Sequence, residues 1–179
     1  QNSATAGSSG AMHITHQTSN VFVYGSTFTG NTSTGRGGAL NFGGTGYILD
    51  STFNSNTLFE SGKADGIAIA ILGGKTTIMG STFTENQGTT GSGAIYSAAN
   101  LVVMDSVFDN NSGNNGAAIK NAGGSLTVMN TDITNNTGQS AWAGVITNTN
   151  TNGKVQINNS TFDANTGTRT IYNLSLIHI

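Results

Sequence analysis

One hexapeptide pattern, S-x-F-x-x-N, recurs along the chain and constrains its fold more than any other feature. The first copy spans residues 26–31, and successive copies are 25, 30, 25, 25 and 29 residues apart. A recurring period of this length indicates a solenoid, in which each repeat stacks on the one before it. The third position of the pattern is occupied by Phe28, Phe53, Phe83, Phe108, Ile133 and Phe162. The last position is occupied by Asn31, Asn56, Asn86, Asn111, Asn136 and Asn165.

Two further motifs precede each hexapeptide. An apolar pair lies seven and five residues before the aromatic position, as in Leu101 and Val103, and this alternation predicts a strand with one inward face. Small residues followed by an aliphatic or methionine residue come earlier, in Gly10-Ala11-Met12, Gly38-Ala39-Leu40, Gly93-Ala94-Ile95, Ala117-Ala118-Ile119 and Ala143-Gly144-Val145. Each repeat is therefore expected to hold three short strands. No window shows the 3.6-residue period of a helix, and the Gly, Asn and Thr content disfavours helices.

These motifs predict an all-β fold, a single-stranded right-handed parallel β-helix of about six to seven coils. Each strand pairs with its equivalent one coil away, at about 4.8 Å. Stacking then makes the aromatic positions an interior column and the asparagines a structural ladder. The two longer repeats carry extra residues around 58–65 and 147–153, and we expect both insertions to form outward loops, where function usually lies.

Composition excludes several functional classes. Apolar residues make up 35% of the chain, which is low for a compact globular core, and charged residues make up only 8%, which is low for disorder. The net charge of −2 is spread along the chain and predicts no nucleic-acid binding. The absence of cysteine excludes a thiolate zinc site and a cysteine nucleophile. The longest apolar run, residues 67–72, is too short for membrane insertion.

The two ends indicate a fragment of a larger protein, because the chain starts without an initiator methionine and stops within a strand-like pattern. We expect residues 1–8 to form a poorly ordered N-terminal edge and residues 9–173 to form the β-helix. Residues 174–179 resemble a translated sequencing adapter and are left out of the fold prediction. Uncapped terminal coils expose unpaired strand edges, which predicts self-association and poor solubility.

The paired motifs resemble the repeats of the chlamydial polymorphic outer-membrane proteins, which carry GGA[ILV] and FxxN motifs. They are similar more broadly to right-handed β-helix passengers of bacterial autotransporter-type proteins. The resemblance covers residues 10–165, and Gly37-Gly38-Ala39-Leu40 with Phe53-Asn54-Ser55-Asn56 forms a full pair. It implies a bacterial module at the outer-membrane surface or secreted, acting in adhesion through a host or cell-surface protein or a glycan.

The enzymatic alternative is a polysaccharide lyase or hydrolase, an activity that needs clustered charge on one face. The best acidic group is Asp109, Asp132 and Asp163, which alternation places on one outward strand face without any Lys or Arg in the same strand. A solvated polar face is the more economical interpretation. His13 and His16 are spaced to point to opposite faces, and Gly73-Gly74-Lys75-Thr76 lacks the first glycine of a phosphate-binding loop. We predict no catalytic residue, no metal site and no cofactor.

One set of equivalent positions is apolar in most repeats, although a strand face in contact with water would be expected to be polar. It lies four residues before the aromatic position, and alternation points it outward, where a continuous apolar stripe would mark an interface. The alternative is that the chain turns there and buries this column as a second interior one. The stripe consists of Tyr24, Leu49, Met79, Met104 and Met129.

Three functions follow, in decreasing order of support. The first is a non-catalytic, surface-displayed or secreted scaffold with adhesin-like contacts through the stripe or the inserted loops. The second is a fragment of a carbohydrate-active β-helix whose catalytic coils lie outside this chain. The third is ice or surface binding by threonines on one outer face, disfavoured because Thr27, Thr52, Thr82 and Thr161 form a broken column.

Overall fold

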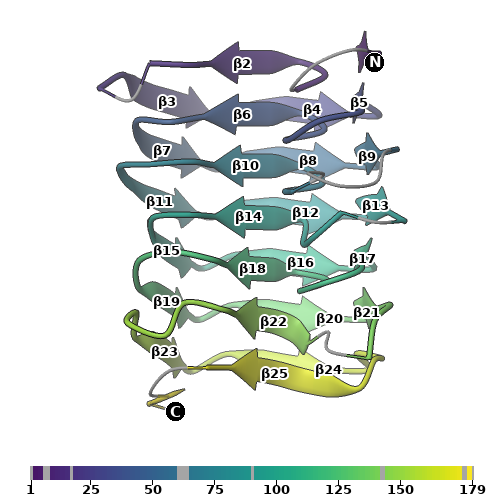
Figure 1. Cartoon of the computed structure of the whole chain (residues 1–179), viewed down its shortest axis with the longest axis vertical. Helices are drawn as coiled ribbons and strands as arrows, with labels where there is room; N and C mark the ends of the chain where they lie inside the picture. Colours follow the sequence, from purple (N-terminus) through teal and green to yellow (C-terminus); the bar gives the residue numbers. More distant parts are fainter. Residues whose placement is uncertain are drawn as a thin grey trace.

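The computed structural model describes residues 2–5, 9–16, 18–59, 65–89, 91–141, 144–174 and 177–178. All strands in these ranges run parallel to their neighbours and stack as a β-solenoid of about six turns (Figure 1). The front strands run to the left and the more distant strands run to the right as the chain descends, so the coil is right-handed. The predicted all-β parallel β-helix is therefore confirmed. The described residues contain no helix long and apolar enough to cross a membrane.

Three sheets correspond to the three predicted strands. Sheet B, on the small-residue motif, contains β2 (Met12–Ile14), β6 (Leu40–Phe42), β10 (Ile69–Ile71), β14 (Ile95–Ser97), β18 (Ile119–Asn121), β22 (Gly144–Asn148) and β25 (Arg169–Asn173). Sheet C, on the apolar pair, contains β3 (Asn20–Tyr24), β7 (Thr45–Leu49), β11 (Lys75–Met79), β15 (Asn100–Met104), β19 (Leu126–Met129), β23 (Val155–Asn158) and β26 (Ile177–His178). Sheet D, on the hexapeptide, contains β4 (Thr27–Thr29), β8 (Thr52–Asn54), β12 (Thr82–Thr84), β16 (Val107–Asp109), β20 (Asp132–Thr134) and β24 (Thr161–Asp163).

A fourth sheet of two-residue strands, sheet A, closes each coil after the motif asparagine. Its short, polar segments lack the alternation that identifies a strand in sequence. It contains β1 (Ser3–Ala4), β5 (Thr32–Ser33), β9 (Thr57–Leu58), β13 (Gln87–Gly88), β17 (Ser112–Gly113) and β21 (Thr137–Gly138). One coil therefore runs through sheets B, C, D and A in turn.

The interior is built from columns of equivalent side chains. Neighbouring rings of Phe28, Phe53, Phe83 and Phe108 stack nearly parallel, with centroids 4.7 to 4.9 Å apart. The column continues through Ile133 to Phe162, and its members between the two ends are fully buried. Stacked offset rings add about 0.5 to 1.5 kcal/mol per pair beyond the burial of their area. The aromatic column is therefore a main part of the core.

Left-handed residues bracket every strand of sheet D and explain the glycine and asparagine content of the turns. The first column has φ between +46° and +61° at Gly25, Asp50, Gly80, Asp105, Asn130 and Asn159. The second column has φ between +50° and +62° at Gly30, Ser55, Glu85, Asn110, Asn135 and Ala164. Glycine adopts this backbone without steric cost, and Asn and Asp tolerate it better than most residues. The chain thus turns sharply twice per coil around the stacked phenylalanines.

The first and last positions of the hexapeptide form two hydrogen-bonded ladders along the stack. The backbone nitrogen of Ser51 donates to Oγ of Ser81 at 3.1 Å, and the same bond recurs between other coils. Nδ2 of Asn56 donates to Oδ1 of Asn86 at 2.9 Å and to the carbonyl of Phe28. Equivalent bonds join the predicted asparagines from Asn31 to Asn165. These ladders satisfy backbone and amide groups that are buried at the turns.

The last copy of the small-residue motif and the start of the second insertion are each displaced from their predicted positions, and residues 149–153 of the insertion lie between β22 and β23. Ile146, rather than Val145, pairs with Ile119, so the last copy of the motif is displaced by one residue. Thr147 and Asn148 are buried in β22 and belong to the coil instead of an outward loop. Asn148 accepts from Asn121 at 2.7 Å and donates to Asn173 at 2.6 Å, which forms a second amide ladder inside sheet B. This pairing holds the longer repeat in register.

The first insertion starts later than its sequence indicates. Leu58 is buried in β9, and Asp65 forms a β-bridge with Ser92, so both residues belong to the stacked coils. Residues 60–64 lie outside the described ranges. At the two ends, Ser3–Ala4 pair with β5, and Ile177–His178 pair with β23.

Candidate binding face

The outer face of sheet C carries two parallel columns of side chains. One column is the predicted stripe, and the register of sheet C aligns Tyr24, Leu49, Met79, Met104 and Met129. The second column lies two residues earlier in each strand and consists of Phe22, Tyr47, Thr77, Val102, Thr127 and Gln156. Both columns follow the long axis of the solenoid.

The stripe points outward, so it is not a second interior column. Tyr24 is 63% exposed and Met79 is 37% exposed, while Leu49, Met104 and Met129 are half-buried. The residues that flank the stripe positions in sequence point inward, as in Val103, because a strand alternates its side chains. A continuous apolar stripe that points outward from a regular sheet and is partly exposed is typical of a contact surface.

Three aromatic side chains gather at the N-terminal end of this face. Phe22 is 67% exposed and Tyr47 is 48% exposed, and the two residues are register partners on β3 and β7. Tyr24 follows Phe22 by two positions on the same face. This aromatic cluster of Phe22, Tyr24 and Tyr47 lies on β7 and on β3, the terminal strand of the sheet, and all five residues of β3 pair with β7.

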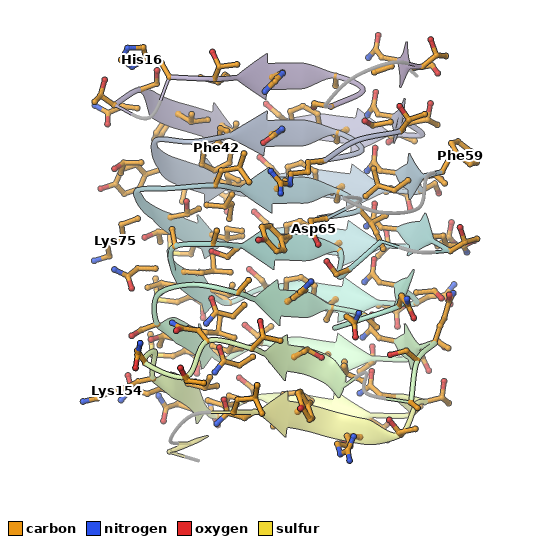
Figure 2. All side chains as sticks on the ribbon, viewed as in Figure 1. His16, Phe42, Phe59, Asp65, Lys75 and Lys154 are labelled. Carbon is orange, nitrogen blue, oxygen red and sulfur yellow. The ribbon has the colours of Figure 1, made fainter. Side chains whose placement is uncertain are left out.

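A shallow pocket of about 240 Å³ opens over sheet A, beside the first insertion. Buried Leu58 and Gly88 contribute to its apolar surface, and Phe59 projects outward beyond the end of β9 with 64% of its surface exposed (Figure 2). The remaining lining residues are uncharged hydroxyl and amide side chains: Thr57, Gln87, Thr89, Ser112 and Gln139. We call this the sheet A pocket.

A charged cluster lies where sheet A turns into sheet B. Asp65 forms ion pairs with Lys120 at 3.3 Å and with Arg36 at 3.8 Å, and Oγ of Ser92 donates to Oδ1 of Asp65 at 2.6 Å. The Lys120 ammonium also lies 5.5 Å from the ring centroid of Tyr96. Burial raises the pKa of Tyr96, the charge of Asp65 raises it further, and Arg36 lowers it. The phenol is therefore held neutral.

This cluster has the composition of a structural clamp between coils. Among the described residues its single carboxylate is Asp65, which is already paired with two cations, whereas glycoside hydrolysis uses two carboxylates that flank the bond. A raised tyrosine pKa also disfavours the phenolate that a base would require. The ion pair of Asp65 with Lys120 ties together segments separated by 55 residues in sequence.

The predicted acidic group lies on the outer face of sheet D. Asp109 and Asp163 share one column, with Thr134 between them, and Asp132 occupies the neighbouring column. Oδ1 of Asp109 accepts hydrogen bonds from Thr134 and Asn135 at 2.7 Å. No strand of sheet D contains a Lys or Arg. The outer threonine column is interrupted by Val107 and Asp132, as its sequence indicates.

The described residues include no group of three or more His, Asp or Glu side chains placed to hold a metal. His13 is exposed on β2, and Nδ1 of His16 lies 2.8 Å from Oγ1 of Thr18. Gly73 and Gly74 lie in the bend between β10 and β11, with Lys75 at the start of β11. Figure 2 shows Lys75 and Lys154 projecting from one edge of the solenoid, apart from Asp65.

Sequence reasoning passed over Phe22 and Tyr47, which lie between the two inward positions of β3 and β7. Alternation alone predicts that both point outward, so the signal was present. The charged cluster left no comparable signal, because Arg36, Asp65 and Lys120 occupy different positions within their repeats.

No protein-family model matches the chain, and no curated protein or solved structure is significantly similar to it.

Proposed function

We propose that this chain is a non-catalytic β-helix module that presents the outer face of sheet C to a binding partner. The observation that carries this proposal is the continuous stripe from Tyr24 to Met129, which leaves apolar side chains outward on a regular parallel sheet. Burying that surface against a partner is favourable at about 25 cal/mol per Å² of apolar area. A solenoid suits this role because it holds its side chains at a constant spacing over a long face.

The proposed setting is the bacterial outer-membrane surface or the extracellular space, with an adhesin-like role. The support is the paired small-residue and FxxN motifs, which resemble those of polymorphic outer-membrane proteins and autotransporter passengers. In this fold the pairs lead into sheet B and build sheet D: Gly38-Ala39-Leu40 ends at the first residue of β6, and Phe53 lies on β8. Sheet C lies outside both motifs, and its outer residues are therefore free to vary with the partner.

A charge substitution tests the binding face. We expect Met104→Glu to reduce retention of the purified protein on immobilised cell layers and polysaccharide matrices, because a carboxylate must be desolvated on contact. Val107→Glu is the matched control, since Val107 is also half-buried and outward but lies on sheet D. Retention that is absent from every surface, or that falls equally in both variants, contradicts the proposal.

The carbohydrate-active alternative is tested in the same preparations. Asp109→Ala would abolish polyuronate depolymerisation if the acidic group of sheet D were catalytic. We expect no depolymerisation by the parent protein, because the acidic group has no Lys or Arg on its sheet. Product release by the parent that Asp109→Ala removes would replace the binding proposal with an enzymatic one.

A further inference from the structure

We infer that the aromatic cluster of Phe22, Tyr24 and Tyr47 binds an uncharged linear polysaccharide that lies along the solenoid axis. This inference rests on the proposed function, since it names the ligand class for one end of the sheet C face. Four observations carry it: the spacing of its strand positions, its polar neighbours, the absence of charged residues from β3 and β7, and the small area of the stripe.

The three aromatic residues occupy spaced, outward-pointing positions on β3 and β7. Phe22 and Tyr47 are register partners, so their backbones are about 4.8 Å apart along the axis, and Tyr24 lies about 6.6 Å from Phe22 across it. The axial step is close to the length of one pyranose unit in an extended polymer. Aromatic faces carry negative charge density that attracts the polarised C–H bonds of a sugar ring. Consecutive sugars can therefore lie over consecutive coils.

The neighbours of the aromatic cluster supply neutral hydrogen-bonding groups. Asn20 and Thr45 are register partners on the same outward face, two residues before Phe22 and Tyr47. Their amide and hydroxyl groups, with the phenols of Tyr24 and Tyr47, match the hydroxyls of a sugar. A site with a few polar groups around an apolar surface is typical of specific small-ligand recognition.

Charge favours a neutral ligand. Neither β3 nor β7 contains an Asp, Glu, Lys or Arg. The nearest cation on the sheet is the single Lys75, which begins the following strand, β11. One solvated lysine provides little of the electrostatic attraction that a polyanion requires.

The shape of the face favours a linear chain over a protein surface. Five strands at about 4.8 Å and two columns about 6.6 Å apart give a stripe of about 24 by 13 Å, or about 310 Å². A standard protein interface buries about 800 Å² on each partner. A second copy of this chain or another globular partner would therefore have to cover the polar faces as well, whereas a single polysaccharide chain matches the stripe.

Native affinity gel electrophoresis tests the inference on the full chain. The gels contain hydroxyethyl cellulose or xyloglucan as uncharged polymers, and polygalacturonate as the charged comparison. Phe22→Thr and Tyr47→Thr remove the rings, and threonine is compatible with this position because Thr77 occupies it in the next coil. We expect retardation of the parent in an uncharged gel and about tenfold weaker binding for each variant.

Phe59→Ala is the control, because Phe59 is as exposed as Phe22 but lies at the sheet A pocket. We expect it to bind like the parent, and far-UV circular dichroism confirms that each variant is folded. The inference is overturned if neither uncharged gel retards the parent, if polygalacturonate retards it more strongly, or if Phe59→Ala weakens binding as much as Phe22→Thr. Retention on cell layers that still depends on Met104 in such a case would preserve the proposed function and reject only the ligand class.

Discussion

Asn86 provides the most direct test of the ladder, because it lies near the middle of the column and is fully buried. Its Oδ1 accepts hydrogen bonds from the backbone nitrogen and from Nδ2 of Asn56, at 3.0 and 2.9 Å. Its Nδ2 donates to the carbonyl of Phe53 at 3.0 Å and to Oδ1 of Asn111 at 2.9 Å. Asn86→Ala removes all four bonds. The buried backbone nitrogen of Asn56 then loses the Oδ1 atom that accepts its hydrogen bond.

The magnitude follows from these bonds. At about 1 kcal/mol each, their loss lowers the free energy of unfolding by about 4 kcal/mol, and water cannot replace them in the closed column. Asn165→Ala is the matched control, since Asn165 has the same role at the last coil but is only half-buried. Water can reach its former partners, so we expect a loss of about 1 kcal/mol.

Urea unfolding followed by far-UV circular dichroism measures both variants against the parent. The transition midpoints report stability, and the slopes show whether the solenoid still unfolds as one unit. The reasoning would be refuted if Asn86→Ala lowered the free energy of unfolding no more than Asn165→Ala does. That result would mean that burial does not make the central ladder bonds more stabilising than the terminal ones.

Three further outcomes are expected. Phe83→Ala should lower the free energy of unfolding in urea by about 3 to 5 kcal/mol, because Phe83 stacks on both sides in the closed core. Phe162→Ala should lower it clearly less, because Phe162 is half-buried. Equal losses would contradict the column as a core element. The pKa of Tyr96 is raised above its ordinary value of 10.0, chiefly by burial, so its contribution to stability is present below about pH 10 and is lost as pH rises through the folded pKa. Tyr96→Phe should remove this alkaline loss, measured as unfolding free energy against pH, and an unchanged alkaline limb would contradict it. Peroxide should oxidise exposed Met79 faster than half-buried Met104, as measured by peptide mass mapping, and the reverse order would contradict the placement of the stripe.

Much of the fold was accessible from sequence because a solenoid repeats its contacts. Each residue of one coil meets its equivalent in the next, so the period of the sequence is the period of the structure. The aromatic column from Phe28 and the ladder from Asn31 could therefore be predicted residue by residue. The outward stripe followed from strand alternation, and the same rule would have found Phe22 and Tyr47.

Register within irregular coils was harder to predict. The amide ladder between Asn121 and Asn148 joins two coils. This ladder sets the position of Ile146 and places Thr147 and Asn148 within β22. The two-residue strands of sheet A have no apolar alternation, and their pairing is imposed by the longer sheets on either side.

The sequence by itself determined the stack: its period, its parallel strands in a right-handed coil, its aromatic column and its asparagine ladder. These features arise between equivalent residues, which a repeat identifies directly. Only the tertiary structure decided how different columns meet, as where Asp65 lies beside Arg36 and Lys120, and where Phe59 borders the sheet A pocket. Those contacts depend on where each bend directs a side chain, and bend geometry is set by packing across the coil, not by the repeat.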